Sequence, residues 1–301
     1  MNGTRESLGQ PVLIGPRPRT LTAAALLTAI RPRQWSKNLL LFAALVYASR
    51  LSSIHASGEA VWAFVIFCGL SSAGYLFNDM LDAHRDRLHP IKRLRPYAAG
   101  LIPTGILIRV AVALAVASLL GSILLGPAFL AWAAGYLGVT VAYSSILKSV
   151  RPFDVLAVAG GFVIRAVAGA AAIGVPASAW LSLLTGLAAL LIVLGKRRHA
   201  VTQTRHRRQS RALPLDLGLA AVAGLTVAAY FLYAFLGSTL SRPGAFATVP
   251  FVAVGVVRYL LLIWRQGLGG SPEMLPFQDP VLAVSVGGWI VTSLLVLYGV
   301  P

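Results

Sequence analysis

The chain has 301 residues, of which 57% are hydrophobic and only 12% are charged. A soluble domain carries about 25% charged residues, so this composition excludes a water-soluble globule and favours a membrane protein. The 26 Lys and Arg residues outnumber the 9 Asp and Glu residues and give a net charge of +17. Such an excess is typical of the cytoplasmic loops of membrane proteins, so we expect no nucleic-acid partner. The single cysteine, Cys68, excludes an internal disulfide and is expected to be a small buried side chain.

Two N-terminal segments precede the first long apolar run. Residues 1–20 are rich in Arg, Gly and Pro and predict a disordered, basic, cytoplasmic tail. Residues 21–30 are apolar but are followed at once by Arg31 and Arg33, which leaves no small-residue cleavage region. We therefore expect an interfacial helix rather than a cleaved signal, and a single membrane-embedded domain over residues 21–301.

Nine apolar runs follow, each close to the length that crosses a bilayer. The predicted fold is therefore all-α and polytopic, with nine transmembrane helices. We place these spans near residues 38–54, 61–78, 104–125, 128–147, 154–174, 179–195, 215–236, 247–264 and 280–299.

Charge supports this arrangement and indicates where a site lies. With a cytoplasmic N-terminus, the cytoplasmic stretches are 1–37, 79–103, 148–153, 196–214 and 265–279, and they hold most of the Lys and Arg residues, as the positive-inside rule requires. Of the nine acidic residues, only Glu59 falls on the outer side. Because acidic groups contribute little to topology, this one-sided distribution favours a metal and phosphate site at the cytoplasmic membrane boundary.

The strongest motif is NDMLDAHRD, residues 78–86. On a helix, Asn78, Asp82 and Asp86 lie at about 0°, 40° and 80°, so three oxygen donors share one face, with Asp79 at its edge about 100° around. Mg²⁺ prefers oxygen ligands and is usually held by one or two carboxylates plus substrate phosphates. The four residues are thus predicted metal ligands, and Asp82 and Asp86 also predicted catalytic residues. The alternative is a solvated acidic helix end that nearby arginines neutralise.

Basic residues beside this motif predict a polyphosphate site. Arg85 lies within the motif, and Arg93 and Arg95 follow in a loop bounded by Pro and Gly. Guanidinium groups bind phosphate oxygens in a bidentate manner. Taken alone, such a loop is more often a topology signal or a lipid contact, and its place next to the carboxylates is what favours substrate binding.

A second group of polar residues lies around the loop between the fourth and fifth predicted spans. It contains Tyr143, Lys148, Asp154 and Arg165. The last two are 11 residues apart, about three turns, and therefore share one helix face. An arginine inside an apolar span indicates a functional site, so we expect Arg165 to contact substrate, with a structural pair to an acid as the alternative.

Two further cytoplasmic stretches contribute residues. Lys196 and Arg197 follow the sixth predicted span and are expected to reach the common site. Asp279 at the entry to the last span is a predicted ligand or orienting residue. His199 and His206 have no evident third ligand, so a zinc site is not expected. The sequence contains no Ser-His-Asp grouping, Walker phosphate loop or Rossmann fingerprint.

The motif N-D-x-x-D-x-x-x-D at the cytoplasmic end of the second of nine spans resembles the UbiA superfamily of intramembrane prenyltransferases. The resemblance covers about residues 30–300. It implies helices around a central cavity with a cytoplasmic cap and a lateral opening for lipid. It also implies that Asn78, Asp82 and Asp86 bind the Mg²⁺ that holds a diphosphate.

Other segments are similar to one branch of that superfamily, the decaprenyl-phosphate 5-phosphoribosyltransferases. These segments are RPRQWSKNLLLFA, YSSILKSVRPFD, GFVIRAVAG, ASAW and GKRRHA. The resemblance implies transfer of 5-phosphoribosyl from phosphoribosyl pyrophosphate to decaprenyl phosphate for arabinan cell-wall precursors, in a bacterial plasma membrane. The residues that it implies hold phosphates and ribose are Lys37, Tyr143, Lys148, Asp154, Arg165, Lys196 and Arg197, with Asp154 also predicted to be catalytic.

Two positions depart from the expected patterns. The second Asp-rich motif usual after the sixth span is absent, which weakens the aromatic prenyltransferase alternative, and His199 stands where a Glu is expected. That alternative transfers a polyprenyl group from its diphosphate to an aromatic acceptor. A transporter is the alternative from another functional class. The charged residues gather at one membrane face, however, and do not indicate a transport pathway across the membrane. The expected partners are the two phosphorylated substrates, the membrane and a second copy of the chain as a homo-oligomer.

Overall fold

The computed structural model describes residues 22–203, 213–236 and 244–299, and in these ranges helices are the only regular secondary structure. This confirms the all-α prediction. The predicted tail over residues 1–20 lies outside the described residues, as does His206. Eight helices have 18 residues or more: α3 (Ile54–Leu88), α4 (Thr104–Ser122), α5 (Pro127–Ser145), α6 (Phe153–Ala172), α7 (Ala179–Gln203), α8 (Leu213–Leu236), α9 (Val249–Gln266) and α11 (Pro280–Tyr298).

Shorter elements connect these helices. The short α-helices are α1 (Ala23–Ile30), α2 (Ala43–Tyr47) and α10 (Leu275–Gln278). The 3-10 helices are η1 (Pro32–Phe42), η2 (Lys92–Leu94), η3 (Ile123–Leu125), η4 (Leu147–Ser149), η5 (Ala245–Thr248) and η6 (Pro272–Met274). Helix α1 confirms that residues 21–30 contain a short helix, and it begins at the N-cap Thr22, whose hydroxyl accepts from the backbone N–H of Ala25.

Among the described residues, seven helices are long and apolar enough to cross a membrane. They correspond to seven of the nine expected spans. The eighth long helix, α5, is not among the seven. The expected span over 38–54 is no continuous α-helix, because η1 and α2 cover residues 32–47 and a turn follows. That boundary prediction is wrong.

The second span also differs from its prediction, since α3 begins at Ile54 and continues to Leu88 instead of covering 61–78. Its start is fixed by Ser53, whose hydroxyl accepts from the backbone N–H of Ala56. No proline interrupts the chain until Pro90, so the helix runs without a break through the whole Asp motif. The expectation that residues 78–86 are helical is thereby confirmed.

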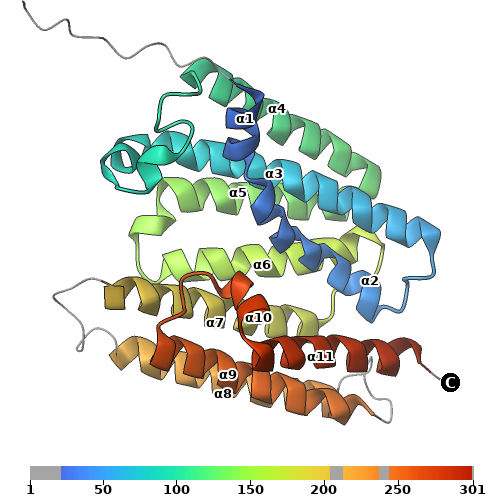
Figure 1. Cartoon of the computed structure of the whole chain (residues 1–301). Coiled ribbons are helices and arrows are strands. Elements are labelled where there is room, and N and C mark those ends of the chain that lie inside the picture. Colours follow the sequence, from blue (N-terminus) through green and yellow to red (C-terminus); the bar gives the residue numbers. More distant parts are fainter. Residues whose placement is uncertain (1–21, 204–212, 237–243, 300–301) are drawn as a thin grey trace, which may run out of the picture.

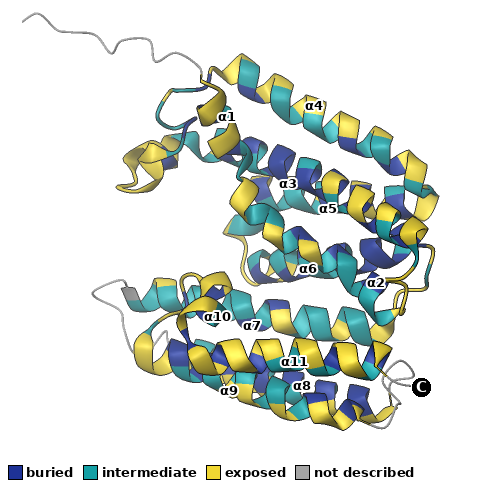
Figure 2. Cartoon of the chain, turned by 45° about the vertical axis from the view of Figure 1, so that its right-hand side comes forward, coloured by how far each residue is buried: buried dark blue, intermediate teal, exposed yellow. Residues whose placement is uncertain are grey.

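The long helices pack side by side in the order α4, α3, α5, α6, α7, α8, α9 and α11 (Figure 1). Helices α3 and α6 are the most buried, whereas α4 and α11 have exposed residues along their outward faces (Figure 2). Exposed apolar residues such as Val112, Leu120, Val284 and Leu295 suit contact with lipid tails.

The N-terminal segment η1–α2 crosses the inner helices of this row and reaches its last helix, α11. It packs against α3 and α6, and at its other end the Tyr298 hydroxyl of α11 donates to the Val46 carbonyl at 2.8 Å. Its approach to α6 requires a glycine, because a Cβ on Gly169 would lie 2.1 Å from the carbonyl oxygen of Leu41. The η1 backbone is therefore in direct contact with the backbone of the inner helix α6.

Candidate functional site

Three connections that are far apart in the sequence lie at the same end of the bundle: the C-terminus of α3 with η2, the α5–α6 connection with η4, and the C-terminus of α7 (Figure 1). Each carries residues predicted for the site. The structure thus brings the three predicted groups of polar residues to one end of the molecule.

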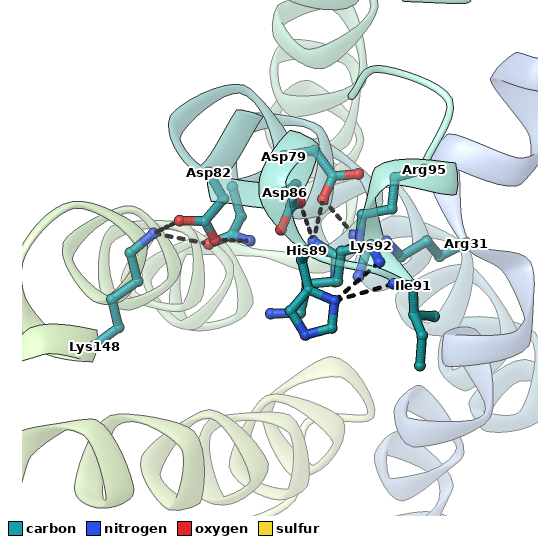
Figure 3. Close-up of polar contacts among 10 residues, drawn as sticks. Arg31, Asp79, Asp82, Asp86, His89, Ile91, Lys92, Arg95 and Lys148 are labelled. Carbon is teal, nitrogen blue, oxygen red and sulfur yellow. Dashed lines mark hydrogen bonds and ion pairs between the residues drawn. The ribbon is translucent and has the colours of Figure 1, made fainter. Parts of the chain in front are cut away.

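The helical spacing divides the Asp motif into two pairs, not one continuous row (Figure 3). Asn78 and Asp82 are one turn apart, and Asn78 Nδ2 donates to Asp82 Oδ2 at 3.0 Å. Asp79 and Asp86 are seven residues apart, which on an α-helix leaves them only about 20° apart around the axis. Both contact Arg95, so Asp79 pairs with Asp86 and not with its neighbour Asn78.

Lys148 neutralises the first pair. Its Nζ lies 2.8 Å from Asp82 Oδ1 and 3.3 Å from Asn78 Oδ1. The 3-10 helix η4, between α5 and α6, carries this lysine, and its side chain extends to Asp82 on α3 (Figure 3). The side chains of Lys148 and Asp82 are each about one-fifth exposed, so the contact is accessible to a ligand. Lys148 and the Asp motif, predicted separately, are thus in direct contact.

Two arginines neutralise the second pair. Arg95 Nη1 lies 2.6 Å from Asp86 Oδ2 and 3.3 Å from Asp79 Oδ1, and Arg31 Nη2 also donates to Asp79 Oδ1. Both carboxylates are buried. Arg31 joins α1 to η1 and has a left-handed backbone with φ of 56°. Arg31 was not among the predicted site residues, because on its own an arginine before a span is only a topology signal.

The donor set of the Asp motif fits Mg²⁺ in chemistry. Asn78, Asp82 and Asp86 offer amide and carboxylate oxygens, the ligands that Mg²⁺ prefers when substrate phosphates complete its shell. No group of three or more His, Cys, Asp or Glu residues in the described ranges is arranged to hold a metal ion by itself. Asp79 was predicted as a ligand, but its Oδ1 accepts from two guanidinium groups. Its contacts are those of a residue that positions Arg31 and Arg95.

A further ion pair lies beside Lys148. Arg197 Nη1 on α7 lies 3.3 Å from Asp154 Oδ1 in the first turn of α6. Both side chains are about one-fifth exposed. Tyr143 on α5 is half-buried and is acted on electrostatically by both Asp154 and Asp82. Tyr143 thus lies within electrostatic reach of both this ion pair and the Asp82 side of the motif.

A second group of cations comprises Lys37 on η1 and Lys196 on α7. Lys196 Nζ is 3.3 Å from Glu273 Oε2, and both side chains are more than one-third exposed. Burial, together with the positive charges of Lys196 and Arg165, lowers the pKa of Lys37 to about 8. Lys37 and Lys196 thus form a positively charged pair opposed by one carboxylate. Glu273 was noted in the sequence only as part of a loop.

Arg165 is buried within the bundle, with 5% of its surface exposed. Its Nε donates to Asn38 Oδ1 at 2.8 Å, its Nη1 to the Gly161 carbonyl at 2.8 Å and its Nη2 to the Tyr136 hydroxyl at 2.7 Å. Cys68, buried as expected, accepts from Asn38 Nδ2 at 3.4 Å. Asp154 and Arg165 share α6 as predicted but do not contact each other. The substrate contact expected of Arg165 stays a prediction.

Three predicted residues remain outside these contacts. Arg85 and Arg93 are exposed and form no ion pair in the part of the chain that the structure describes. Asp279 caps α11 by accepting from the backbone N–H of Leu282, and it also pairs with Arg258 at 2.6 Å. These contacts fix the start of α11, and the predicted substrate contact of Asp279 stays a prediction. His199 contacts the carbonyl of Gly267 through Nδ1.

Comparison with known proteins agrees with this geometry. Residues 39–272 match the model of the UbiA prenyltransferase family. The chain is 34% identical to the decaprenyl-phosphate phosphoribosyltransferase of Mycobacterium tuberculosis over 92% of its own length and 95% of that protein. Identity to the enzyme of the same name from Mycolicibacterium smegmatis is also 34%, over 99% of both chains.

Solved structures show the same fold. A UbiA homolog from Archaeoglobus fulgidus, bound to DMAPP and Mg²⁺, superposes with a TM-score of 0.68 at 18% identity over 92% of this chain and all of that one. The digeranylgeranylglyceryl phosphate synthase structure superposes with a TM-score of 0.65 at 13% identity, over 90% of this chain and 98% of the other.

Proposed function

The chain belongs to the UbiA prenyltransferase family, and from this premise we propose that it is a membrane enzyme that transfers 5-phosphoribosyl from phosphoribosyl pyrophosphate to decaprenyl phosphate. The observation that carries the proposal is its likeness to decaprenyl-phosphate phosphoribosyltransferases over nearly the whole chain. The product is a lipid-linked pentose phosphate for the synthesis of arabinan cell-wall precursors. The positively charged end of the bundle suits a reaction in which both substrates are anionic.

In this reaction one bond is exchanged for another at the anomeric carbon of the ribose. The bond to the pyrophosphate oxygen breaks, a bond to an oxygen of the lipid phosphate forms, and pyrophosphate leaves with the electron pair. No protein nucleophile is needed, so catalysis depends on positioning the two phosphates and stabilising negative charge on the leaving group.

Asn78, Asp82 and Asp86 are the residues that we propose to hold Mg²⁺. The bound ion would supply charge neutralisation for the pyrophosphate. Lys148 and Arg95, which contact Asp82 and Asp86, would be released beside the same site if these carboxylates held the ion. Both cations would then be available to donate to phosphate oxygens, Lys148 through its ammonium group and Arg95 through its guanidinium group. Asp79 stays with Arg31 and positions it.

Most of the remaining predicted residues are proposed to bind the other groups of the substrates. The ion pair of Arg197 and Asp154, with Tyr143 within electrostatic reach of Asp154, is proposed to bind a phosphate and a ribose hydroxyl. Lys37 and Lys196, whose charges act on each other, are proposed to bind a second phosphate. Exposed Arg85 and Arg93 are proposed to attract the anionic substrates from the solvent.

We further propose nine membrane crossings around a central cavity with a cytoplasmic cap. Eight come from the long helices and one from η1–α2. The crossing by η1–α2 begins at Asn38, as the expected span boundary has it, so Lys37 stays at its cytoplasmic end. The positive-inside rule then places the site on the cytoplasmic side of the plasma membrane.

The runner-up function is prenyl transfer from a polyprenyl diphosphate to an aromatic acceptor. The specific observation in its favour is the fold shared with a homolog that was solved with DMAPP and Mg²⁺. It uses the same metal site but changes which substrate carries the diphosphate.

A radiolabel assay separates the two functions. The purified chain in lipid nanodiscs receives Mg²⁺, labelled phosphoribosyl pyrophosphate and decaprenyl phosphate, and the label is followed into the lipid extract. We expect labelled lipid that disappears with EDTA and in Asp82→Ala. Glu59→Gln is the matched control, because Glu59 lies on the same helix at its other end. No labelled lipid, together with product from a polyprenyl diphosphate and an aromatic acceptor, would replace the proposed function by the runner-up.

A further inference from the structure

Arg165 differs from the other cations of the site in its partners. Arg31, Arg95, Lys148, Lys196 and Arg197 each contact a carboxylate. Arg165 has no carboxylate oxygen within 4 Å in the described ranges, and its three hydrogen bonds go to an amide, a backbone carbonyl and a phenol. The ring of Tyr136 also lies 4.6 Å from its guanidinium carbon.

A buried positive charge without a counter-ion is unusual. Buried charges in proteins are generally paired, because removing an ion from water costs several kcal/mol. An arginine that served only to join helices would be expected to pair with an acid. The guanidinium group of Arg165 has hydrogen bonds and ring contacts, but no carboxylate compensates its charge. This indicates that the positive charge itself has a functional role.

The surroundings of Arg165 show where that charge acts. Its Nε bond to Asn38 joins α6 to η1, and Asn38 directly follows Lys37. Asn38 is fully buried, and its Nδ2 donates onward to Ser71 at 3.3 Å, which fixes its orientation. Lys37 forms no ion pair within the described part of the chain. The charges that act on Lys37 are those of Lys196, Arg165 and Arg31, against the single carboxylate of Glu273.

We propose that Arg165 is a positioning residue that does not touch substrate: it holds η1 through Asn38 and uses its uncompensated charge to favour a phosphate group at Lys37. The identity of that phosphate as part of a substrate rests on the proposed function. Arg165 is too buried to be a first contact, and three of its five N–H groups already donate to protein atoms.

The test replaces Asn38 by Asp, which keeps the shape of the side chain and places a counter-charge against Arg165. The Ser71 hydroxyl, which now accepts from Asn38 Nδ2, is able to donate to the new carboxylate instead. Tyr136→Phe is the matched control, because it removes one hydrogen bond from the guanidinium without changing any charge. Arg165→Gln removes the charge but keeps an amide donor toward Asn38.

The first readout is the pH dependence of Lys37 acetylation, followed by mass spectrometry. It requires no substrate and therefore remains valid if the proposed function fails. We expect a midpoint near pH 8 in the parent chain and in Tyr136→Phe. In Asn38→Asp and Arg165→Gln we expect it on the order of one pH unit higher, the size of a charge–charge effect at an effective dielectric constant of ~20. Unchanged midpoints in whichever of these two variants folds would overturn the proposal.

The second readout is the affinity for phosphoribosyl pyrophosphate, measured by calorimetry in nanodiscs. We expect Asn38→Asp to bind at least about threefold more weakly than the parent and Tyr136→Phe to bind within about twofold of it. Equal weakening in both variants would mean that Arg165 acts only by holding η1. A parent chain that does not bind this donor, but whose acetylation midpoint shifts as expected, would reject the proposed substrate and retain the electrostatic role of Arg165.

Discussion

Arg95 bridges two carboxylates that the sequence separates by seven residues: one nitrogen, Nη1, lies 2.6 Å from Asp86 and 3.3 Å from Asp79. The same end of α3 therefore carries one carboxylate, Asp82, that contacts Lys148 and two, Asp79 and Asp86, that contact arginines. The charge balance of the buried pair depends on Arg95, and this leads to the first prediction.

Arg95→Met is expected to destabilise the protein by on the order of 3 kcal/mol, because it leaves two buried carboxylates with less compensation. Asp79→Asn in the same chain removes one of those charges and is expected to recover a substantial part of the loss. Thermal unfolding in detergent gives both values, with Glu59→Gln as the control. Additive losses in the double variant would show that Arg95 and Asp79 do not act on each other.

Lys148→Met is predicted to separate metal binding from turnover. With Lys148 absent, the Asp82 oxygens have no competing cation, so Mn²⁺ used as a spectroscopic substitute is expected to bind several-fold more tightly without substrate. Turnover is expected to fall at least about tenfold, because a phosphate contact is lost. Electron paramagnetic resonance of free Mn²⁺ and the labelled-lipid assay measure the two effects.

Arg50→Met serves as the comparison for Lys148→Met, since Arg50 is exposed, precedes the opposite end of α3 and has no ion pair in the described ranges. Unchanged or weaker Mn²⁺ binding in Lys148→Met would contradict the competition between lysine and metal.

The pKa of Lys37 predicts opposite effects on stability and on binding. Because the pKa is about 8 in the folded chain and 10.5 ordinarily, the unfolded chain binds more protons between these values. Stability contributed by this group therefore rises with pH through that window, and the charged form below pH 8 is a cost to the fold. The affinity for an anionic substrate should fall over the same window, since Lys37 loses its charge.

Lys37→Met is accordingly expected to raise the melting temperature at pH 7 and to weaken donor binding. The decrease in donor affinity above pH 8 that the parent chain shows should be absent in this variant. Calorimetry and thermal unfolding across pH 6.5 to 9.5 test this directly. Glu273→Gln is a useful comparison because its pair with Lys196 is exposed: the change should alter stability by less than about 1 kcal/mol. A lower melting temperature in Lys37→Met would show that the lysine stabilises the fold.

Much of the fold was predictable because apolar runs of about 20 residues separated by basic loops specify membrane helices. The Asp motif was predictable for a similar reason, since its spacing places Asn78 and Asp82 one turn apart. The contact of Asp82 with Lys148 could not be predicted, because it depends on where the α5–α6 connection places Lys148 relative to α3. The pairing of Asp79 with Arg31 likewise depends on the turn between α1 and η1, and no local pattern specifies it.

The remaining differences between prediction and structure arise from contacts between separate helices. Residues 38–54 contain the apolar side chains of a span, but contacts of Asn38 and Leu41 with α6 accompany a 3-10 segment there. The charge of Arg165 indicated a function, whereas its partners come from η1 and α5, which the sequence of α6 alone does not identify. Asp279 precedes a helix, a position that suits a capping residue, and Arg258 on α9 completes its contacts.

The close packing of the η1 backbone against α6 leads to the last prediction. Gly169→Ala puts a Cβ about 2.1 Å from the Leu41 carbonyl oxygen, a backbone atom that moves only if η1 moves. We expect a loss of stability of about 1–3 kcal/mol together with weaker donor binding, because Lys37 and Asn38 lie on the same 3-10 helix. Gly135→Ala is the matched control: a Cβ there has no atom within 4 Å, and alanine is favoured in helices. Stability and donor affinity that match those of the Gly135 variant would contradict the close contact between η1 and α6, and with it the route by which Arg165 positions Lys37.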